Sequence, residues 1–518
     1  MNKTVKIILS VILCLALSVA VSAPCFAKEG KTAFVVVSGM NTFPLTLDGE
    51  NVFPMSTKTI VKQIPDIAVA LMNFADNRDY VSFNEQLYAP VGEIFKLLAC
   101  DSDGNSVYDI KTMQFTESVD EYIGLFENEM NDELGVVNAG IKRYGAENTY
   151  FFNYDWRLDP LDHADKLNEL IKTIKAKNEY DRIEVSAYSM GGTVVCSYLY
   201  KFGSADIDSL ALVSTAFQGT SCVGDLFSGK IELSATGLMK RLSQLTRDNT
   251  LEDLINGISS VLKAVGVLQF VENVSYKFVS ASPDKLYSEL LTPAVGYMQG
   301  LWALCDDVNY EDAKKIMLHG TASEAFIKEI DEYHYNVQQK AEELLNSALK
   351  DTAVYLVAQY NMQGLPVSAV SSTSNNDYLI DTAYEAGGAI CADLGKTLPD
   401  DYVQKVDCGH NHISFDRQID ASTGMLPEYT WFIRDMGHVD FPVGEATDFI
   451  IYLVHSEKQL TVFDSPEYPQ FLKYNYGDGT LKPVNEESLK KTVADNILEF
   501  FNKLVDIFSR FLSLSGQK

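Results

Sequence analysis

The sequence predicts an α/β protein in which a mostly parallel central sheet is flanked by helices. Six short segments rich in apolar, β-branched and aromatic residues recur along the chain, and their apolarity is continuous rather than alternating. Continuous apolarity is typical of parallel strands covered on both faces. Helical patterns such as 164–174 separate these segments, which indicates an open α/β sheet. The expected strands are 32–39, 149–156, 182–189, 209–216, 353–360 and 429–434.

The composition is that of a globular protein. The 518 residues are 46% hydrophobic and 22% charged, which excludes a disordered or collagen-like chain. Lys and Arg number 42 against 71 Asp and Glu, so the formal net charge is -29. Because such a surface repels phosphates and anionic lipid headgroups, nucleic acid is not an expected partner.

The N-terminus has the pattern of a signal peptide. Residues 1–27 combine two early lysines, an apolar segment from Ile7 to Val21 and small residues before Ala27. The apolar segment is short for a membrane-spanning helix. We expect cleavage after Ala27, with Ala23 as the alternative, and a secreted or cell-surface protein.

Six cysteines follow the expected cleavage site. They are widely spaced, so disulfides are permitted but not required, and no pair has metal-ligand spacing. We therefore expect neither a metal nor a cofactor. The six are Cys100, Cys196, Cys222, Cys305, Cys391 and Cys408.

A helical insertion divides the expected sheet. Residues 28–217 and 351–458 carry the strands, whereas 218–350 are almost wholly helical. An insertion between two core strands lies naturally over the carboxyl edge of the sheet, where ligands bind. We expect it to form a cap whose inner face lines an acyl pocket; a self-contained helical subdomain is the alternative.

The C-terminal tail, 459–518, ends in an amphipathic pattern. Apolar residues recur three or four apart between Leu489 and Leu514, behind Asn485 as a helix cap. The polar face of this helix is mixed rather than basic, so docking onto the domain is expected. Weak contact with a membrane surface is the alternative.

The sharpest local motif surrounds Ser189. Small residues, Ala187 and Gly191, lie two positions before and after this serine, between an expected strand and an expected helix. This is the pattern of a nucleophile elbow, in which a tight strand–turn–helix exposes a catalytic serine. A serine that merely caps the helix is the alternative.

An elbow serine requires an oxyanion hole. The backbone N–H of Met190, the residue after the serine, is one expected donor. The second donor should come from the loop after the first strand, where Gly39 allows a sharp turn and Met40 follows. A plain strand-ending turn is the alternative for this loop.

The order of residues along the chain favours His438 as the general base. It follows the strand expected at 429–434, and the histidine of such a triad comes after both the nucleophile and the acid. His410 and His412 precede that strand. They are alternatives as the base, as loop histidines or as a weak metal pair that lacks carboxylate ligands at a defined spacing.

The triad acid must lie between Ala358 and His438. Asp416 is favoured because Ile419, three residues later, can turn back into the core. Asp420 is the closest alternative, although it also suits the cap of a short helix. The full set of candidates is Asp377, Asp381, Asp407, Asp416 and Asp420.

Two further segments resemble the lecithin:cholesterol acyltransferase family. Tyr154–Leu158 is similar to the family's YDWR segment, and Phe217–Thr220 is similar to its AP-x-x-G-[ST] segment. The resemblance covers 32–220 and 350–445. It implies an α/β-hydrolase fold and serine-dependent acyl transfer on lipid esters. Carried over by position, it implies Ser189, Asp416 and His438 as the triad.

The chain departs from that family at two points. Ala187 replaces the first glycine of the elbow, and the acid loop GDGTV is absent ahead of His438. Hydrolysis by a lipase or esterase is therefore as compatible as transfer to a sterol. For Arg157, in the YDWR segment, we expect a buried pair with Asp155 or another acid rather than direct catalysis.

These observations predict a secreted serine-dependent lipid-ester hydrolase or O-acyltransferase that works through a Ser-His-Asp triad and an acyl-enzyme. Its expected partner is a lipid or other ester substrate. The alternative is a non-catalytic, hydrolase-like secreted protein that binds a lipid or a polymer. The sequence leaves the acyl chain, the acceptor and the oligomeric state open.

Overall fold

A computed structural model describes residues 31–126, 134–177, 179–245, 249–264, 266–438 and 444–489. At its centre is an eight-stranded sheet in the order β14-β13-β12-β7-β6-β5-β1-β4. Neighbouring strands are parallel throughout, except that β14 runs antiparallel to β13. This arrangement confirms the predicted α/β class. The strands are β1 (Thr32–Val37), β4 (Thr149–Phe152), β5 (Arg182–Tyr188), β6 (Ser209–Val213), β7 (Ala353–Tyr360), β12 (Thr430–Arg434), β13 (Phe471–Asn475) and β14 (Thr480–Pro483).

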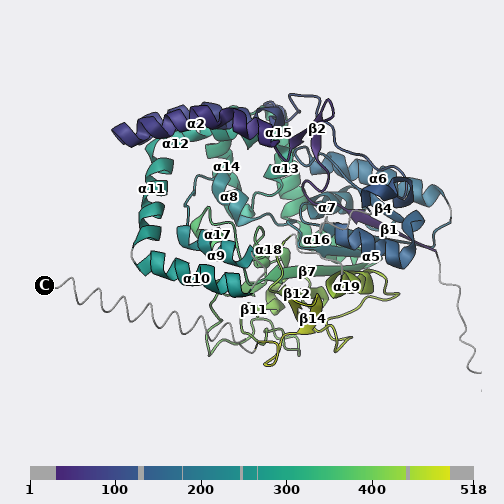
Figure 1. Cartoon of the computed structure of the whole chain (residues 1–518). Helices are drawn as coiled ribbons and strands as arrows, with labels where there is room; N and C mark the ends of the chain where they lie inside the picture. The colour runs from purple at the N-terminus through teal and green to yellow at the C-terminus, as the bar shows by residue number, and fades with distance from the viewer. Residues whose placement is uncertain are drawn as a thin grey trace, which may run out of the picture.

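Helices bury the sheet on both faces, which explains the continuous apolarity of its strands. Along β1, Ala33, Val35 and Val37 belong to one core, and Phe34 and Val36 belong to the other. Helices α6 (Pro160–Ala176), α7 (Gly191–Phe202) and α16 (Ala341–Ala348) contribute to the first core, and α5 (Gly135–Tyr144) and α19 (Glu445–Val454) contribute to the second (Figure 1).

The helical insertion folds between β6 and β7, as expected. It has its own core, in which Trp302 packs against Phe227 and Tyr310. Its members are α8 (Ser221–Phe227), α9 (Ala235–Leu245), α10 (Asn249–Ala264), α11 (Val267–Ala281), α12 (Pro283–Lys285), η5 (Leu286–Gly296), α13 (Gln299–Trp302), α14 (Asp307–Ala313), η6 (Lys314–Leu318), α15 (Glu324–Tyr333), η7 (His334–Gln338) and α16.

Two helices near the N-terminus join this insertion. Helices α2 (Thr57–Asn77) and α3 (Tyr80–Phe95) follow β1 and the hairpin of β2 (Leu45–Leu47) and β3 (Glu50–Phe53). The Asn84 side chain of α3 donates a hydrogen bond of 2.8 Å to the Phe278 carbonyl of α11, and Phe83 packs edge-on against Phe278. Figure 1 shows α2 at the edge of the molecule. The sequence pattern did not reveal this second helical segment.

The remaining short elements connect the strands and the longer helices. They are η1 (Lys96–Leu98), η2 (Val119–Tyr122), α4 (Ile123–Phe126), η4 (Ala146–Asn148), β8 (Met362–Gln363), α17 (Ala369–Thr373), β9 (Asn375–Asn376), α18 (Thr382–Glu385), β10 (Ile390–Cys391), β11 (Ile419–Asp420), η8 (Ala421–Thr423) and η9 (Pro427–Tyr429). The hairpin of β13 and β14 extends the central sheet, so part of the expected C-terminal tail belongs to the core.

Both ends of the chain carry predictions that lie outside the described residues. These are the signal peptide at 1–27 and all but the first residue of the amphipathic segment 489–514. Within the described ranges, no helix has both the length and the apolarity needed to cross a membrane. The six cysteines from Cys100 to Cys408 are all unpaired.

Candidate active site

Ser189 lies at a strained turn between β5 and α7. Its φ of 51° is in the left-handed region, which non-glycine residues rarely occupy. The turn requires small neighbours: a Cβ on Gly191 would come within 2.6 Å of the Ser38 carbonyl oxygen, and one on Gly192 within 2.5 Å of Thr215 Cβ. The turn therefore has the geometry of a nucleophile elbow.

A continuous hydrogen-bonded chain joins Ser189, His438 and Asp377. His438 Nε2 lies 2.7 Å from Ser189 Oγ, and His438 Nδ1 lies 2.5 Å from Asp377 Oδ2. In the neutral tautomer that fits this chain, Nδ1–H donates to the carboxylate and Nε2 accepts the serine proton. The His438 backbone N–H also donates to the Asp377 carbonyl over 2.6 Å. The structure thus brings the expected serine and histidine together with Asp377, an acid candidate that the sequence did not favour.

Asp377 is fully buried, yet its surroundings favour the ionised form. Its Oδ1 accepts hydrogen bonds from the backbone N–H groups of Leu379, at 2.9 Å, and Ile380, at 2.7 Å. Burial raises the pKa of Asp377, but the facing imidazole, a hydrogen bond from Glu385 and the Ile380 N–H together hold that pKa below its usual value. A carboxylate at this position can stabilise an imidazolium.

Glu385, on α18, is a second buried carboxyl group within 4.8 Å of the ligand atoms of Asp377 and His438. Its Oε2 accepts a hydrogen bond from the Gln359 N–H at 2.6 Å. Among the described residues, its Oε1 has no hydrogen-bond partner. Burial and the neighbouring Asp377 charge raise the pKa of Glu385 well above its usual value. A protonated Glu385 would donate a hydrogen bond to Asp377, and the pair would then hold a single negative charge.

Replacing Glu385 with Gln tests this protonation state. The pKa of Glu385 is higher in the folded than in the unfolded protein. The contribution of Glu385 to stability is therefore full below its unfolded pKa of about 4.5, and it declines as the pH rises towards its folded pKa. Gln cannot ionise and keeps a donor, so we expect the stability of E385Q relative to wild type to increase above that pH. Thermal unfolding across pH, with the exposed E457Q as control, checks this; parallel profiles for wild type and E385Q would contradict it.

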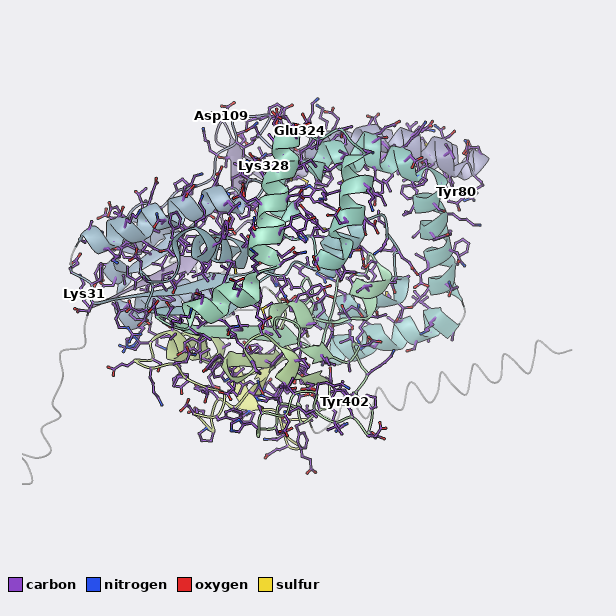
Figure 2. All side chains as sticks on the ribbon, turned by 180° about the vertical axis from the view of Figure 1, so that it is seen from behind. Lys31, Tyr80, Asp109, Glu324, Lys328 and Tyr402 are labelled. Carbon is purple, nitrogen blue, oxygen red and sulfur yellow. The ribbon has the colours of Figure 1, made fainter. Side chains whose placement is uncertain are left out.

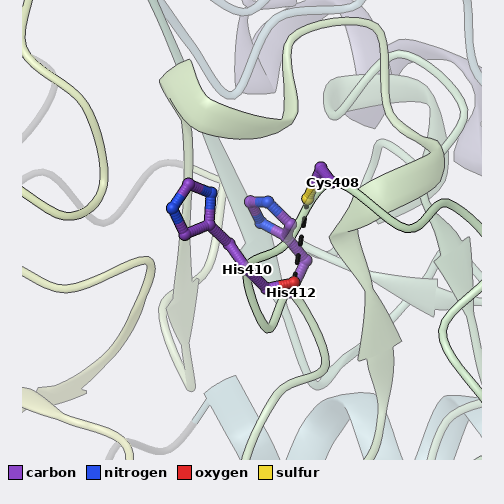
Figure 3. Close-up of side chains that lie close together, drawn as sticks. All are labelled: Cys408, His410 and His412. Atoms are coloured by element: carbon purple, nitrogen blue, oxygen red, sulfur yellow. Dashed lines mark hydrogen bonds between the residues drawn. The ribbon is translucent and has the colours of Figure 1, made fainter.

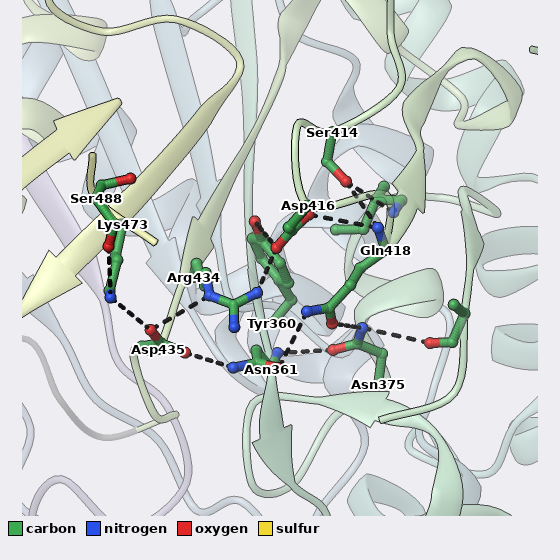
Figure 4. A network of polar contacts seen from close by, with 12 residues as sticks. Tyr360, Asn361, Asn375, Ser414, Asp416, Gln418, Arg434, Asp435, Lys473 and Ser488 are labelled. Carbon is green, nitrogen blue, oxygen red and sulfur yellow. Dashed lines mark hydrogen bonds and ion pairs between the residues drawn. The ribbon is translucent and has the colours of Figure 1, made fainter. Parts of the chain in front are cut away.

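Asp416 is not the triad acid, contrary to the prediction from the sequence. Its Oδ2 accepts from Arg434 Nη1 and, at 3.1 Å, from the Tyr360 hydroxyl (Figure 4). Arg434 is the last residue of β12, so Asp416 approaches the strand before His438 but is bound to its arginine. The spacing of Asp416 and Ile419 matches that of an acid loop, but it cannot reveal that Asp416 pairs with Arg434.

Asp420 is not the acid either. Its Oδ1 caps the short helix η8 by accepting the Ser422 N–H at 3.0 Å, as the alternative interpretation expected. Its Oδ2 accepts from the Tyr402 hydroxyl and the Lys405 N–H, each at 2.9 Å. His410 and His412 lie together on a separate loop and do not contact Ser189.

The expected oxyanion donors flank Ser189. A Cβ on Gly39 would lie 2.9 Å from Ser189 Cβ, so the loop after β1 reaches the nucleophile. Met190 is the N-cap residue of α7. Within the described part of the chain, the N–H groups of Met40 and Met190 have no intramolecular acceptor. The loop positions agree with the expectation, and the donor roles remain predictions.

The helical insertion reaches the elbow through α13. The Gly300 N–H donates to the Arg157 carbonyl at 3.0 Å, and a Cβ on Gly300 would come within 2.6 Å of Met190 Cε. Helix α13 of the insertion thus lies beside Met190, the residue that follows the nucleophile. Its large aromatic Trp302, however, fills the insertion's own core, whereas Phe270 is exposed. The acyl pocket expected under this insertion stays a prediction.

Arg157 is structural, as expected. Its fully buried guanidinium forms a two-pronged ion pair with Asp155 at 2.6 and 3.0 Å. It also donates to the Leu98 carbonyl at 2.8 Å and to Ser106 Oγ at 2.9 Å. These bonds connect the YDWR segment to the residues that follow α3. The guanidinium is not part of the triad.

Comparisons with known proteins add little to this geometry. No protein-family model and no curated protein matches the chain. Among solved structures, one chain of "The crystal structure of Tle4-Tli4 complex" is 11% identical and has a TM-score of 0.29. The match covers 83% of this chain and all of that one. At so low a TM-score the fold assignment rests on the strand order and the elbow of this chain itself.

Proposed function

We propose that this protein is a serine hydrolase or O-acyltransferase that acts on lipid esters. The observation that carries the proposal is the hydrogen-bonded chain from Ser189 through His438 to buried Asp377. In this fold class such a chain has a direct chemical use, because a positioned imidazole raises the nucleophilicity of the serine.

The proposed reaction has two acyl-transfer steps. His438 Nε2 accepts the hydroxyl proton as Ser189 Oγ attacks the ester carbonyl carbon, and Asp377 stabilises the imidazolium that forms. The N–H groups of Met40 and Met190 would stabilise the oxyanion. His438 then gives its proton to the departing alcohol, which leaves an acyl group on Ser189. Water or a second alcohol, deprotonated by His438, takes the acyl group and frees the serine.

Exposed apolar side chains on the outer helices support an apolar ester as substrate. On α2 and α11 they occur in amphipathic helices, and Phe270 of α11 is 68% exposed. Apolar residues gathered on surface helices are typical of surfaces that meet lipids or other apolar partners. They include Ile60, Val61, Ile64, Leu71, Met72, Phe270, Val271 and Tyr276. The signal-like N-terminus supports export, where such substrates are met at or outside the cell surface.

A panel of p-nitrophenyl esters of increasing acyl length tests the proposed function. We expect hydrolysis that favours medium or long chains over acetate, and transfer to an added alcohol if the protein is an acyltransferase. Mass spectrometry of the products separates the free acid from the new ester. Binding of these esters with no turnover by freshly purified protein would instead favour a non-catalytic lipid-binding protein.

A further inference from the structure

A cluster of three metal-ligating side chains lies on the loop 404–412, which is separate from Ser189. Ligand atoms of Cys408, His410 and His412 all lie within 4.8 Å of one another (Figure 3). In Figure 2, Tyr402, which shortly precedes this loop, lies on the side of the molecule opposite Glu324 and Lys328 of α15. We propose that these three residues bind a Zn²⁺ ion.

His412 supplies the strongest argument, because its free nitrogen is buried. The residue is fully buried, and its Nδ1 lies 2.7 Å from Gln470 Oε1. The Gln470 amide nitrogen donates to the carbonyls of Pro427, at 2.7 Å, and Thr430, at 3.1 Å, which fixes the amide orientation. Nδ1 must therefore be the protonated nitrogen, since Oε1 can only accept.

This tautomer leaves a lone pair on His412 Nε2. Among the described residues, Nε2 has no hydrogen-bond partner, although buried polar nitrogens are nearly always paired. A metal ion would satisfy it. An imidazole that donates its other N–H to a protein oxygen is the usual arrangement of a metal-bound histidine.

The loop is built to hold the other two ligands beside it. The Gln404 amide nitrogen donates to the carbonyls of Val406, at 2.7 Å, and His410, at 3.0 Å, and its Oε1 accepts from the His412 N–H at 2.7 Å. Gly409 has a φ of 81°, a conformation that glycine adopts without strain. Gln404 and Gly409 thus set the turn that brings Cys408 and the two histidines together.

His410 is oriented by contacts on both sides. Its ring packs against Phe463 with centroids 4.3 Å apart, and its Nδ1 faces Glu428 Oε1 at 3.7 Å. At least one of its two ring nitrogens lies close to the ligand atoms of Cys408 and His412. A thiolate and two imidazoles suit Zn²⁺, which binds in tetrahedral sites and would keep a fourth position for water or a carboxylate. Binding would release the Cys408 thiol proton to solvent.

Metal content of the full-length purified protein tests the site. After chelation and dialysis against Zn²⁺, we expect one tightly bound equivalent, and with Co²⁺ a sulfur-to-metal charge-transfer absorbance. C408S and H410Q change solvent-facing side chains, so both should fold normally and lose at least tenfold in affinity; C408S, which removes the sulfur ligand, should also lose the charge-transfer band. N411A, from the same loop, is the matched control and should bind like wild type.

A second control separates this site from the triad. Of the described residues, Asp377, Glu385 and His438 form the other group with metal-ligating atoms close together. H438A should therefore keep the bound ion while losing ester turnover. No bound equivalent in wild type, or unchanged binding in both C408S and H410Q, would overturn the zinc site without touching the proposed function.

Discussion

Replacing Asp377 with Asn is expected to lower ester turnover by about 10⁴-fold, the size of the effect for the same change in a serine-protease triad. Asn can accept the Leu379 and Ile380 N–H bonds at the position of Oδ1. Its amide, however, would donate to His438 Nδ1 and so favour the tautomer with the proton on Nε2, which cannot accept the proton of Ser189. Steady-state kinetics on a chromogenic ester, with circular dichroism to verify folding, measures the effect.

Asp416 and Asp420, the two acids that the sequence favoured, provide matched controls. D416N weakens a buried ion pair with Arg434, so we expect a stability loss of about 3 kcal/mol with turnover within tenfold of wild type. D420N loses part of a helix cap, which costs about 1 kcal/mol. Near-normal turnover in D377N together with a large loss in D416N would instead identify Asp416 as the triad acid.

Replacing Ser189 with Ala is expected to abolish turnover, with a loss on the order of 10⁶-fold in kcat. The substitution removes one oxygen and its 2.7 Å hydrogen bond to His438, so its effect on stability should be about 1 kcal/mol or less. Comparison of kcat and of the melting temperature separates loss of chemistry from loss of structure.

Ser197 offers a matched control for this change. It is a fully buried serine on α7, and its hydroxyl donates to the Thr193 carbonyl at 2.8 Å. S197A also removes one oxygen and one hydrogen bond, so its stability should change by a similar amount while kcat stays within a few-fold of wild type. Equal turnover losses in S189A and S197A would indicate a general folding defect.

The sequence alone was sufficient to predict Ser189 as the nucleophile and His438 as its base. The elbow motif is local, because Ala187, Ser189 and Gly191 lie within five residues, although the atoms that exclude a Cβ at Gly191 and Gly192 belong to the distant Ser38 and Thr215. Chain order indicates His438, since it follows β12, the last of the six strands that the sequence predicts. The six expected strands were found because burial on two faces leaves a continuous apolar pattern.

The sequence did not favour Asp377 over the other candidates because its position depends on long-range contacts. Asp377 lies in the segment 362–407, whose polar composition is typical of a surface excursion. The segment instead contains buried groups: Asp377 faces His438, and Asp381 accepts from the Ser221 N–H and hydroxyl at 2.8 and 2.9 Å. A short polar segment buried by partners from α8 and the histidine loop has no local apolar signature.

The arrangement of the Cys408–His412 loop also depends on long-range contacts that the sequence does not reveal. The sequence allows His410 and His412 to be a weak metal pair, but it has no carboxylate at a standard spacing beside them. The structure adds what spacing could not give: the Cys408 sulfur is brought close by the turn at Gly409, and Gln470 fixes the His412 tautomer from 58 residues away.

Labelling with a fluorophosphonate probe tests the catalytic account most directly, because the probe reacts only with an activated serine. The account predicts one covalent adduct per chain in wild type, mapped by peptide mass spectrometry to Ser189, weaker labelling in H438A and none in S189A. An unlabelled wild-type protein that is folded and monodisperse, or equal labelling of wild type and S189A, would contradict it.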